Sequence, residues 1–368
     1  MAVNSTALDM ASDLAELGTL QEVEDPPDDV WIPGKMPDAP AKSRQVLRSA
    51  FAHEQSGGGT TDVRRPIHPH SEDSAHLDPI LALDDFTVAL PDGFPDHAHR
   101  GFITLTYLLP SSPGGLTHED FLGNAGTLHP GDAQWMTCGR GILHSEVPAS
   151  SFFARGLQMW INLPEKEKMA APEYLELPRA RQLRAATAGV KAAVLAGEAL
   201  GHHQDGPNHG PELVLLVPDG GSLWSFFHVL FFADWTSSFS RQAPWARVHY
   251  TMEPGAVLHQ PIPEGHTAFI YTLAGGVVVA DVVADAHHCL ILSAAAGEDG
   301  VTVRTQSSEA SFFLCAAKPL REPVVWQGPF VMCSEEQIRQ SMLDYQCDQN
   351  GFERASSWNS RNKLRMVT

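Results

Sequence analysis

Short segments in which apolar and polar residues alternate run along most of the chain, and turn-forming residues separate them. In ITLTYLL (103–109), threonines and a tyrosine alternate with aliphatic residues, which is the two-residue period of a half-buried strand rather than that of a helix. Other short apolar segments at close spacing are PILALDDFTVAL (79–90), GTLHPGDAQWM (126–136) and GLQMWINLP (156–164). Many short strands joined by turns predict an all-β sandwich or barrel.

A fainter second copy of this pattern follows residue 245. HTAFIYTLAGG (266–276) echoes GFITLTYLLPSSPGG (101–115), and EPGAVLHQPIPEG (253–265) shares its Pro-Gly turn with HPGDAQWM (129–136). Self-similarity of this kind is the sequence signature of a duplicated unit. We therefore expect two β-barrels in tandem.

The regions outside these strands suggest where the parts of the chain begin and end. Residues 1–44 carry acidic residues and prolines but few aromatic residues, which predicts a flexible acidic tail with at most a short helix near 14–20. We expect the first barrel over residues 45–178 and the second over residues 179–368.

One helix is predicted near the C-terminus, in CSEEQIRQSMLDYQ (333–346). Ser334 lies three residues before Gln337, which matches a capping box, and Ile338 and Met342 fall on one face. The pattern predicts a short surface helix that packs on a barrel.

Composition agrees with a turn-rich globular protein and restricts its partners. The 368 residues are 43% hydrophobic and 19% charged, with 27 prolines and 30 glycines, a composition typical of a folded chain with many turns. The formal net charge of -19 argues against direct binding to nucleic acid, because such binding depends on clustered lysines and arginines. Any nuclear role would therefore act through protein partners.

Cysteine usage and the N-terminal sequence indicate a reducing compartment. The cysteines are odd in number, widely spaced and without a CxxC pair: Cys138, Cys289, Cys315, Cys333 and Cys347. We therefore expect no disulfide framework. The N-terminus has neither a basic region nor an apolar signal segment, and the apolar stretch at 222–235 is too short to span a bilayer. We expect no membrane association and a cytoplasmic location.

Two pairs of residues carry the candidate chemistry. In FPDHAHRG (94–101), His97 and His99 stand two residues apart, and His144 and Glu146 repeat that spacing in GRGILHSEVP (139–148). Residues i and i+2 of a strand point to the same face, so three imidazoles and one carboxylate would converge if the strands are neighbours. Such a set suits Fe, Mn, Co, Ni, Cu or Zn rather than Mg or Ca. Both a closed structural zinc and an octahedral site with open positions fit it.

The remaining candidate side chains are expected to be structural. His118, His129, His249 and His259 each stand alone in the sequence, and a lone histidine is more often hydrogen-bonded or exposed than a metal ligand. Cys138 is expected to be a small buried residue.

Several longer segments resemble the pirin family of the cupin superfamily: GFPDHAHRGFITLTYLL (93–109), HEDFLGNAGTLHPGDAQWMTCGRGILHSEVP (118–148), GLQMWINLP (156–164), RVHYTMEPGAVLHQPIPEGHTAFIYTLAGG (247–276) and EPVVWQGPFVMCSEEQI (322–338). The resemblance covers roughly residues 63–165 and 245–355. It implies an all-β fold of two tandem cupin barrels, each a double-stranded β-helix or jelly roll, with a short C-terminal helix.

The resemblance also implies a metal site. It indicates a single iron, Fe(II), in the first barrel, held by His97, His99, His144 and Glu146, with another first-row divalent metal as an alternative. The second barrel would be free of metal, and its copy of the pattern offers only His259.

Two activities are implied by the resemblance. One is quercetin 2,3-dioxygenation, in which a flavonol and O2 are the substrates and Glu146 is both ligand and catalytic base. The alternative is an iron-dependent, redox-sensing co-regulator of transcription that acts through a transcription factor or signalling protein without turnover, as a monomer in the cytoplasm, the nucleus or both. A metal-dependent sugar or acid isomerase is less favoured, because no phosphate-binding cluster accompanies the ligands.

The chain departs from the family pattern in two places. The acidic segment before residue 45 has no family counterpart, and residues 207–242 read as an insertion where the second barrel should begin. The insertion is either an added hairpin or interaction element, or a mis-spliced segment translated into the sequence. Both interpretations stay open.

Overall fold

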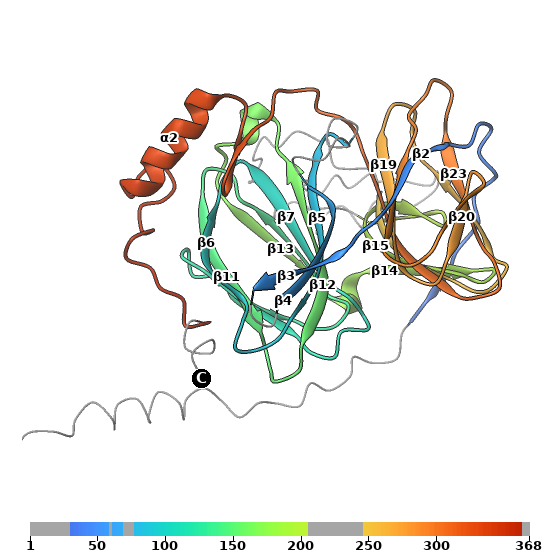
Figure 1. Cartoon of the computed structure of the whole chain (residues 1–368), viewed down its shortest axis with the longest axis horizontal. Helices are drawn as coiled ribbons and strands as arrows, with labels where there is room; N and C mark the ends of the chain where they lie inside the picture. The colour runs from blue at the N-terminus through green and yellow to red at the C-terminus, as the bar shows by residue number, and fades with distance from the viewer. Residues whose placement is uncertain (1–29, 59–60, 69–76, 205–245, 363–368) are drawn as a thin grey trace, which may run out of the picture. The chain divides into compact units, whose positions relative to one another are not determined.

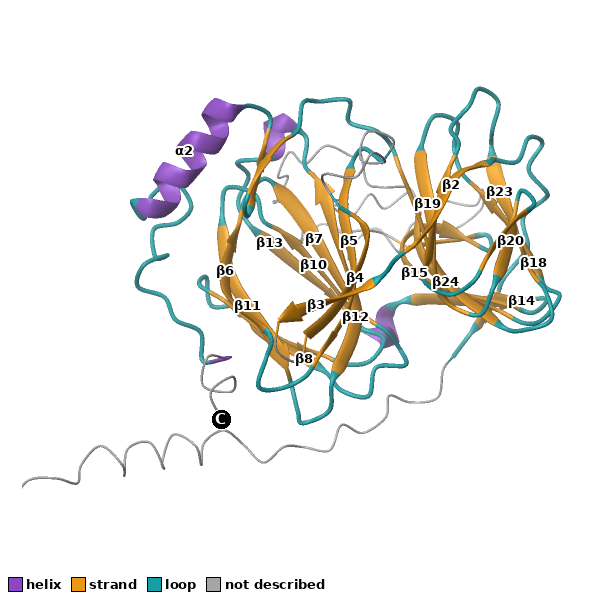
Figure 2. Cartoon of the chain, viewed as in Figure 1, coloured by secondary structure: helices purple, strands orange, loops and turns teal. Residues whose placement is uncertain are grey.

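The computed structural model describes residues 30–58, 61–68, 77–204 and 246–362, and its regular structure is almost entirely β (Figures 1 and 2). The expected helix near 14–20 and the expected insertion at 207–242 lie outside the described residues. Within them, no helix is long and apolar enough to span a membrane. The prediction of an all-β fold with two cupin barrels and a short C-terminal helix is confirmed.

The first barrel is formed by two antiparallel sheets. In spatial order, the larger sheet contains β13 (Glu173–Leu177), β10 (Ala133–Thr137), β7 (Phe102–Leu108), β12 (Ala154–Asn162), β5 (Ile80–Val88), β4 (Thr61–Ile67) and β3 (Glu54–Gly58). The smaller sheet contains β6 (Phe94–His99), β11 (Ile142–Pro148), β8 (Leu116–Asp120) and β9 (Ala125–Leu128). The alternating segment at 103–109 thus forms most of the central strand β7.

The second barrel repeats this plan. Its larger sheet contains β1 (Ile32–Pro33), β14 (Leu183–Thr187), β15 (Val190–Ala199), β17 (Ala246–Met252), β24 (Ala310–Ala317), β19 (Thr267–Ala274), β22 (His288–Leu292) and β2 (Val46–Phe51), with β16 (His202–Gln204) beside β15. Its smaller sheet contains β18 (Val257–Pro261), β23 (Gly300–Thr305), β20 (Val277–Val279) and β21 (Val282–Ala284). Two short 3-10 helices, Glu165–Glu167 and Arg179–Arg181, flank β13.

The repeated strand order supports an internal duplication, but it shows that one of the two similarities seen in the sequence does not join equivalent positions. The small sheets run β6-β11-β8-β9 and β18-β23-β20-β21, so β18 is the counterpart of β6. The Pro-Gly turn at 254–255 leads into β18, whereas the one at 130–131 leads into β10 of a large sheet. These two turns are therefore not equivalent. The strands β7 and β19, which contain the other pair of similar segments, are equivalent.

The ends of the described chain cross over to the opposite barrel, which shifts the expected boundaries. Strand β2 pairs with β22, and β1 pairs with β14. Residues 31–44, expected to belong to a flexible tail, and residues 45–51, expected in the first barrel, therefore both add to the second barrel, and the first barrel's strands start at Glu54. The physical reason is that β2 supplies backbone partners to the β22 edge of the larger sheet, which would otherwise leave its ladder unpaired. Arg44, which is 0% exposed, anchors this segment through hydrogen bonds to three carbonyl oxygens.

The C-terminal segment was expected to belong to the second barrel, but it packs on the first. It contains the hairpin β25 (Val325–Gln327) and β26 (Phe330–Met332) and the helix α2 (Glu335–Gln346). Phe330, Ile338 and Phe352 are buried in one cluster with Phe102 and Met136 of the first barrel. Burial of this apolar face decides the position of the segment.

Helix α2 begins as its capping box predicts. Ser334 is the N-cap residue, and its hydroxyl accepts a hydrogen bond from the Gln337 amide at 3.2 Å. The Gln337 side chain in turn accepts a hydrogen bond from the Cys333 amide at 2.8 Å. The first bond pairs a backbone donor that the first turn of a helix cannot satisfy, and the second pairs the amide of the residue before the N-cap.

A buried ion pair attaches α2 to the end of β6. Arg100 Nη1 donates to Asp344 Oδ2 at 2.8 Å, and both side chains are at most 2% exposed. The other nitrogens of Arg100 donate to the carbonyls of Arg140 and Asn350, and the guanidinium lies over the ring of Phe352. A fully partnered buried cation of this kind holds the helix at one place.

Replacing Asp344 by Ala is expected to lower the free energy of unfolding by about 3–5 kcal/mol, because it leaves the Arg100 guanidinium buried without its counterion. Urea unfolding measures the loss, and limited proteolysis should show earlier cleavage between residues 333 and 362. Glu336→Ala is the matched control, since it removes the exposed i,i+3 pair with Arg339 and should change stability by less than about 1 kcal/mol. Equal losses in the two variants would contradict the role of the buried pair.

Candidate metal centre

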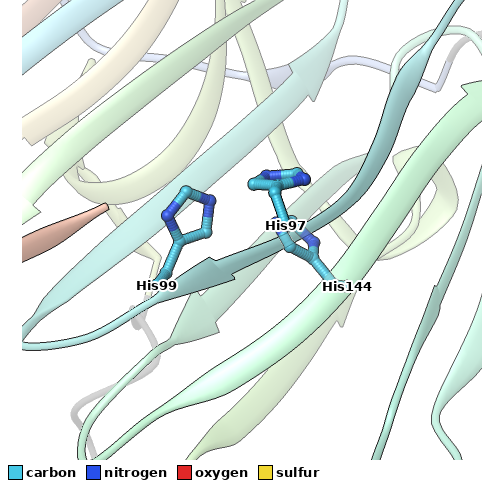
Figure 3. A group of neighbouring side chains, drawn as sticks. All are labelled: His97, His99 and His144. Atoms are coloured by element: carbon cyan, nitrogen blue, oxygen red, sulfur yellow. The ribbon is translucent and has the colours of Figure 1, made fainter. Parts of the chain in front are cut away.

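Three histidines meet inside the first barrel, on two neighbouring strands of the smaller sheet (Figure 3). His97 and His99 lie on β6, and His144 lies on β11, directly opposite His97 in the strand register. Their candidate ligand atoms all lie within 4.8 Å of one another. The ring centroids are 4.3 Å apart for His97 and His144 and 5.0 Å apart for His99 and His144. The i, i+2 spacing on paired strands therefore brings three imidazoles to one point.

The hydrogen bonding of the three rings fits a metal ion. His99 and His144 are each 2% exposed, and none of their four ring nitrogens has a hydrogen-bond partner. His97 Nδ1 lies 2.7 Å from the Pro95 carbonyl, an acceptor that fixes the proton on Nδ1 and leaves the Nε2 lone pair free. Buried polar atoms are nearly always paired, so the set has the donor chemistry of a site for a cation that binds imidazole.

Burial also keeps the rings in the state that binds metal. The pKa of each of the three histidines lies below its usual value, chiefly because burial disfavours the imidazolium form. For His144, the neighbouring His97 and His99 lower the pKa further. A neutral imidazole has a free lone pair at pH 7, as ligation requires.

Glu146 lies on the same face of β11 as His144 but is not among the side chains whose ligand atoms cluster within 4.8 Å. It is 1% exposed. Its Oε1 accepts a hydrogen bond from Thr106 Oγ1 at 3.1 Å, and its Oε2 accepts one from Gln158 Nε2 at 2.9 Å. Burial raises the pKa of Glu146 to about 7, against the opposing effect of these two hydrogen bonds. A carboxyl with this pKa exchanges a proton readily near neutrality.

Trp160 fixes the orientation of the amide that holds Glu146. Its indole Nε1 donates to Gln158 Oε1 at 3.1 Å. Because an indole can only donate, the amide oxygen of Gln158 faces Trp160 and the amide nitrogen faces Glu146. Sequence spacing does not indicate Thr106, Gln158 and Trp160 as site residues. The one indication in the sequence is that Thr106 and Gln158 lie in segments predicted to be strands. The two residues lie opposite each other in the pairing of β7 with β12.

Aromatic rings border the triad on the side of the larger sheet. Trp160 meets His99 edge to face at 5.0 Å between centroids, and stacks on Phe102 at 4.4 Å. The hairpin β25–β26 adds Trp326, which stacks on Trp160 at 5.1 Å. Three stacked aromatic rings thus border the triad on that side.

His118, expected to stand alone, lies directly opposite Glu146 in the pairing of β8 with β11. It is 2% exposed, and its Nε2 lies 2.8 Å from both Glu176 Oε1 and Gln134 Nε2. Sequence spacing could not reveal this neighbour, because it does not show which strands pair. His249 and His259 are hydrogen-bonded away from the triad, to Tyr107 and Thr302 respectively.

The equivalent positions of the second barrel carry other chemistry. On β18, the counterpart of β6, Leu258 and Gln260 stand two residues apart, and Val303 of β23 lies opposite Leu258. All three are 0% exposed. His259 sits between the two inward residues of β18 and therefore faces the other side. Apolar packing takes the place of the histidine cluster in this interior.

Comparison with known sequences agrees with the architecture. The family model described as "Pirin" matches residues 60–161, and the one described as "Pirin C-terminal cupin domain" matches residues 247–351. The chain is similar to pirin of Homo sapiens, with 41% identity over 325 residues that cover 87% of this chain and 98% of that protein. It is also similar to a pirin-like protein of Solanum lycopersicum, with 39% identity over 87% of this chain and 98% of that protein.

A solved structure has the same fold. The crystal structure of a quercetin 2,3-dioxygenase from Acinetobacter baumannii aligns with a TM-score of 0.67 and 25% identity, and the alignment covers 84% of this chain and 99% of that one. Two family models, one on each barrel, and curated relatives at about 40% identity over most of the chain lead to one assignment. The chain belongs to the pirin family of cupin-fold proteins.

Proposed function

We propose that this protein is a mononuclear non-haem iron protein that cleaves a flavonol such as quercetin with O2, as a quercetin 2,3-dioxygenase does. The observation that carries the proposal is the trio of buried imidazoles, two of them without any hydrogen-bond partner, beside a buried carboxyl with a pKa of about 7. The fold similarity to a quercetin 2,3-dioxygenase supports the substrate class.

The protein would hold the iron through His97, His99 and His144, with Glu146 as the fourth ligand. Fe(II) is the proposed ion, and another first-row divalent metal is the alternative, since neutral imidazole and carboxylate ligands suit this group. When bound, the iron would supply the redox-active Lewis acid that dioxygen chemistry requires. The imidazoles, which are neutral at pH 7, need lose no proton to bind it.

Glu146 would act as the base that accepts the proton of the flavonol 3-hydroxyl at its carboxylate. Burial raises the pKa of Glu146, and a bound cation would lower it again, so that the carboxylate form that accepts a proton would be present at neutral pH. Thr106 and Gln158 hold both carboxylate oxygens in place, so the proton acceptor is pre-positioned before substrate binds.

The walls of the site suit a planar aromatic substrate. Trp160 and Phe102 place aromatic rings beside His99, and aromatic rings contact one another favourably edge to face as well as by offset stacking. Phe102 is 0% exposed, so this side of the site offers an apolar surface to a flat conjugated ring.

His144→Ala is expected to lower the iron content of the purified protein at least tenfold, because it removes one of three converging ligands. Elemental analysis after reconstitution with Fe(II) gives the stoichiometry. The control is His259→Ala, whose ring bonds to Thr302 in the second barrel and whose loss should leave iron near the wild-type value. Full iron occupancy in His144→Ala would overturn the assignment of the ligands.

Glu146→Gln is expected to keep part of the bound iron but to lower quercetin turnover by about 10²–10⁴-fold, the usual contribution of a general base. Loss of quercetin absorbance and oxygen uptake by the iron-loaded protein measure it. Turnover at the wild-type rate would exclude Glu146 as the base.

If the iron-loaded wild-type protein itself consumes neither quercetin nor O2, the proposed enzyme activity is wrong, and the redox-sensing co-regulator becomes the preferred function.

Trp160→Phe keeps an aromatic ring but removes the indole donor, so the Gln158 amide loses the contact that orients it. We expect kcat to fall about tenfold, because the free energy of roughly one hydrogen bond is lost from the activation barrier. The iron content should stay unchanged. Trp358→Phe is the matched control, because Trp358 packs against the cluster under α2 and should leave kcat unaltered. Equal kcat values in the two variants would show that Gln158 is held by other contacts.

A further inference from the structure

The interface between the two barrels contains a buried arginine in an unusual setting. Arg247 lies on β17 of the second barrel, opposite Cys315 of β24. Its guanidinium carbon is 4.7 Å from the ring centroid of Trp135, which lies on β10 of the first barrel. Arg247 is 0% exposed and Trp135 is 1% exposed. Figure 2 labels β10 and β24, the strands of the two large sheets that carry Trp135 and Cys315.

The donors at this point have no strong acceptor among the described residues. Arg247 Nε, Nη1 and Nη2 have no nitrogen or oxygen hydrogen-bond partner, and neither has Trp135 Nε1. The Cys315 thiol interacts with the guanidinium, but sulfur is a weak acceptor and one thiol cannot satisfy five N–H groups. Buried polar groups are nearly always paired, so a place where unsatisfied donors meet indicates an acceptor from outside the chain.

The other two fully buried arginines of the described chain provide an internal comparison. Arg44 donates to the carbonyls of His266, Ser293 and Pro263. Arg100 donates to Asp344 and to two carbonyls. Arg44 keeps one nitrogen without a partner, Nε, but Arg247 is the one of these three in which no guanidinium nitrogen has a nitrogen or oxygen partner.

The group also lacks a counterion within the described residues. Burial lowers the pKa of Arg247 to about 10, so it still carries its charge at pH 7. The neighbouring Cys315 thiol does not neutralise it, because burial raises the pKa of Cys315 to about 11. An isolated buried cation costs several kcal/mol, a cost that a bound anion would offset.

We propose that Arg247 and Trp135 bind a small inorganic anion, a halide or an oxyanion, between the two barrels. The anion would accept hydrogen bonds from the guanidinium and from the indole N–H, so that one ion links a strand of each barrel. The site is separate from the histidine trio, and the proposal stands whether or not the protein cleaves flavonols.

Thermal unfolding of the full chain at constant ionic strength tests the site. The protein is dialysed into a HEPES buffer without smaller anions, and sodium chloride, bromide, phosphate or acetate replaces sodium HEPES stepwise. At least one anion should raise Tm saturably, by about 5 °C at about 100 times its Kd. Constant ionic strength removes general screening as a cause.

Three variants make the test specific. Arg247→Leu should abolish the response and, in the anion-free buffer, should be as stable as the wild type or more so, because no uncompensated cation remains. Trp135→Phe keeps the ring and the cation but removes one donor, so saturation should require more anion. Arg304→Leu removes an exposed charge of the second barrel and should respond like the wild type.

Bromide soaked into crystals gives a direct readout, with an anomalous peak expected within hydrogen-bond distance of the Arg247 nitrogens. The proposal is wrong if no anion changes Tm, if Arg247→Leu responds as the wild type does, or if only water occupies the site in the presence of bromide. If Arg247→Leu fails to fold, the anion concentration that saturates the increase in Tm of Trp135→Phe decides the question. The same concentration as in the wild type overturns the proposal.

Discussion

The candidate site depends on the pairing of β6 with β11. His97 lies opposite His144 and His99 opposite Ile142, and the register shifts before Glu146, which lies opposite Phe94. A slip by one residue at the histidines would turn their side chains to the opposite face. Ala98 and Leu143 lie opposite each other, next to the histidines, and both are buried in the cluster that contains Ile338 of α2. Burial of this apolar pair favours the register that brings the histidines together.

The same strands are fixed from outside by distant parts of the chain. Arg100, next to His99, is held by Asp344 of α2. Lys168 donates to the carbonyls of Gly101 and Val331 and so joins the end of β6 to the C-terminal hairpin. Gly101 has a positive φ, and a side chain there would collide with the Val331 carbonyl, so the hairpin approaches as closely as the backbone allows. Rigid support of this kind is what a preorganised site needs.

Much of this could be predicted from the sequence, and the failures have a common cause. Alternation predicts strands such as β7, the capping box predicts α2, and the HxH and HxE spacings predict the convergence of His97, His99 and His144. These signals are local. The positions of Gln158, Trp160 and His118 near Glu146 depend on which strands pair, and so does the placement of residues 31–51 on the second barrel and of residues 325–352 on the first. Single-sequence periodicity carries no information on pairing partners, so these features appear only in the folded chain.

The crossing of the chain ends has a consequence for biosynthesis. Residues 46–51 leave the ribosome before any strand of the first barrel, yet their partner β22 is made some 240 residues later. The cover of the first barrel, α2, follows every strand of both barrels. The strands of the first barrel can pair as soon as residue 177 is made, but that barrel receives its cover only after the second barrel has been translated. The apolar surface under α2 is therefore exposed on the nascent chain for as long as the second barrel takes to be made.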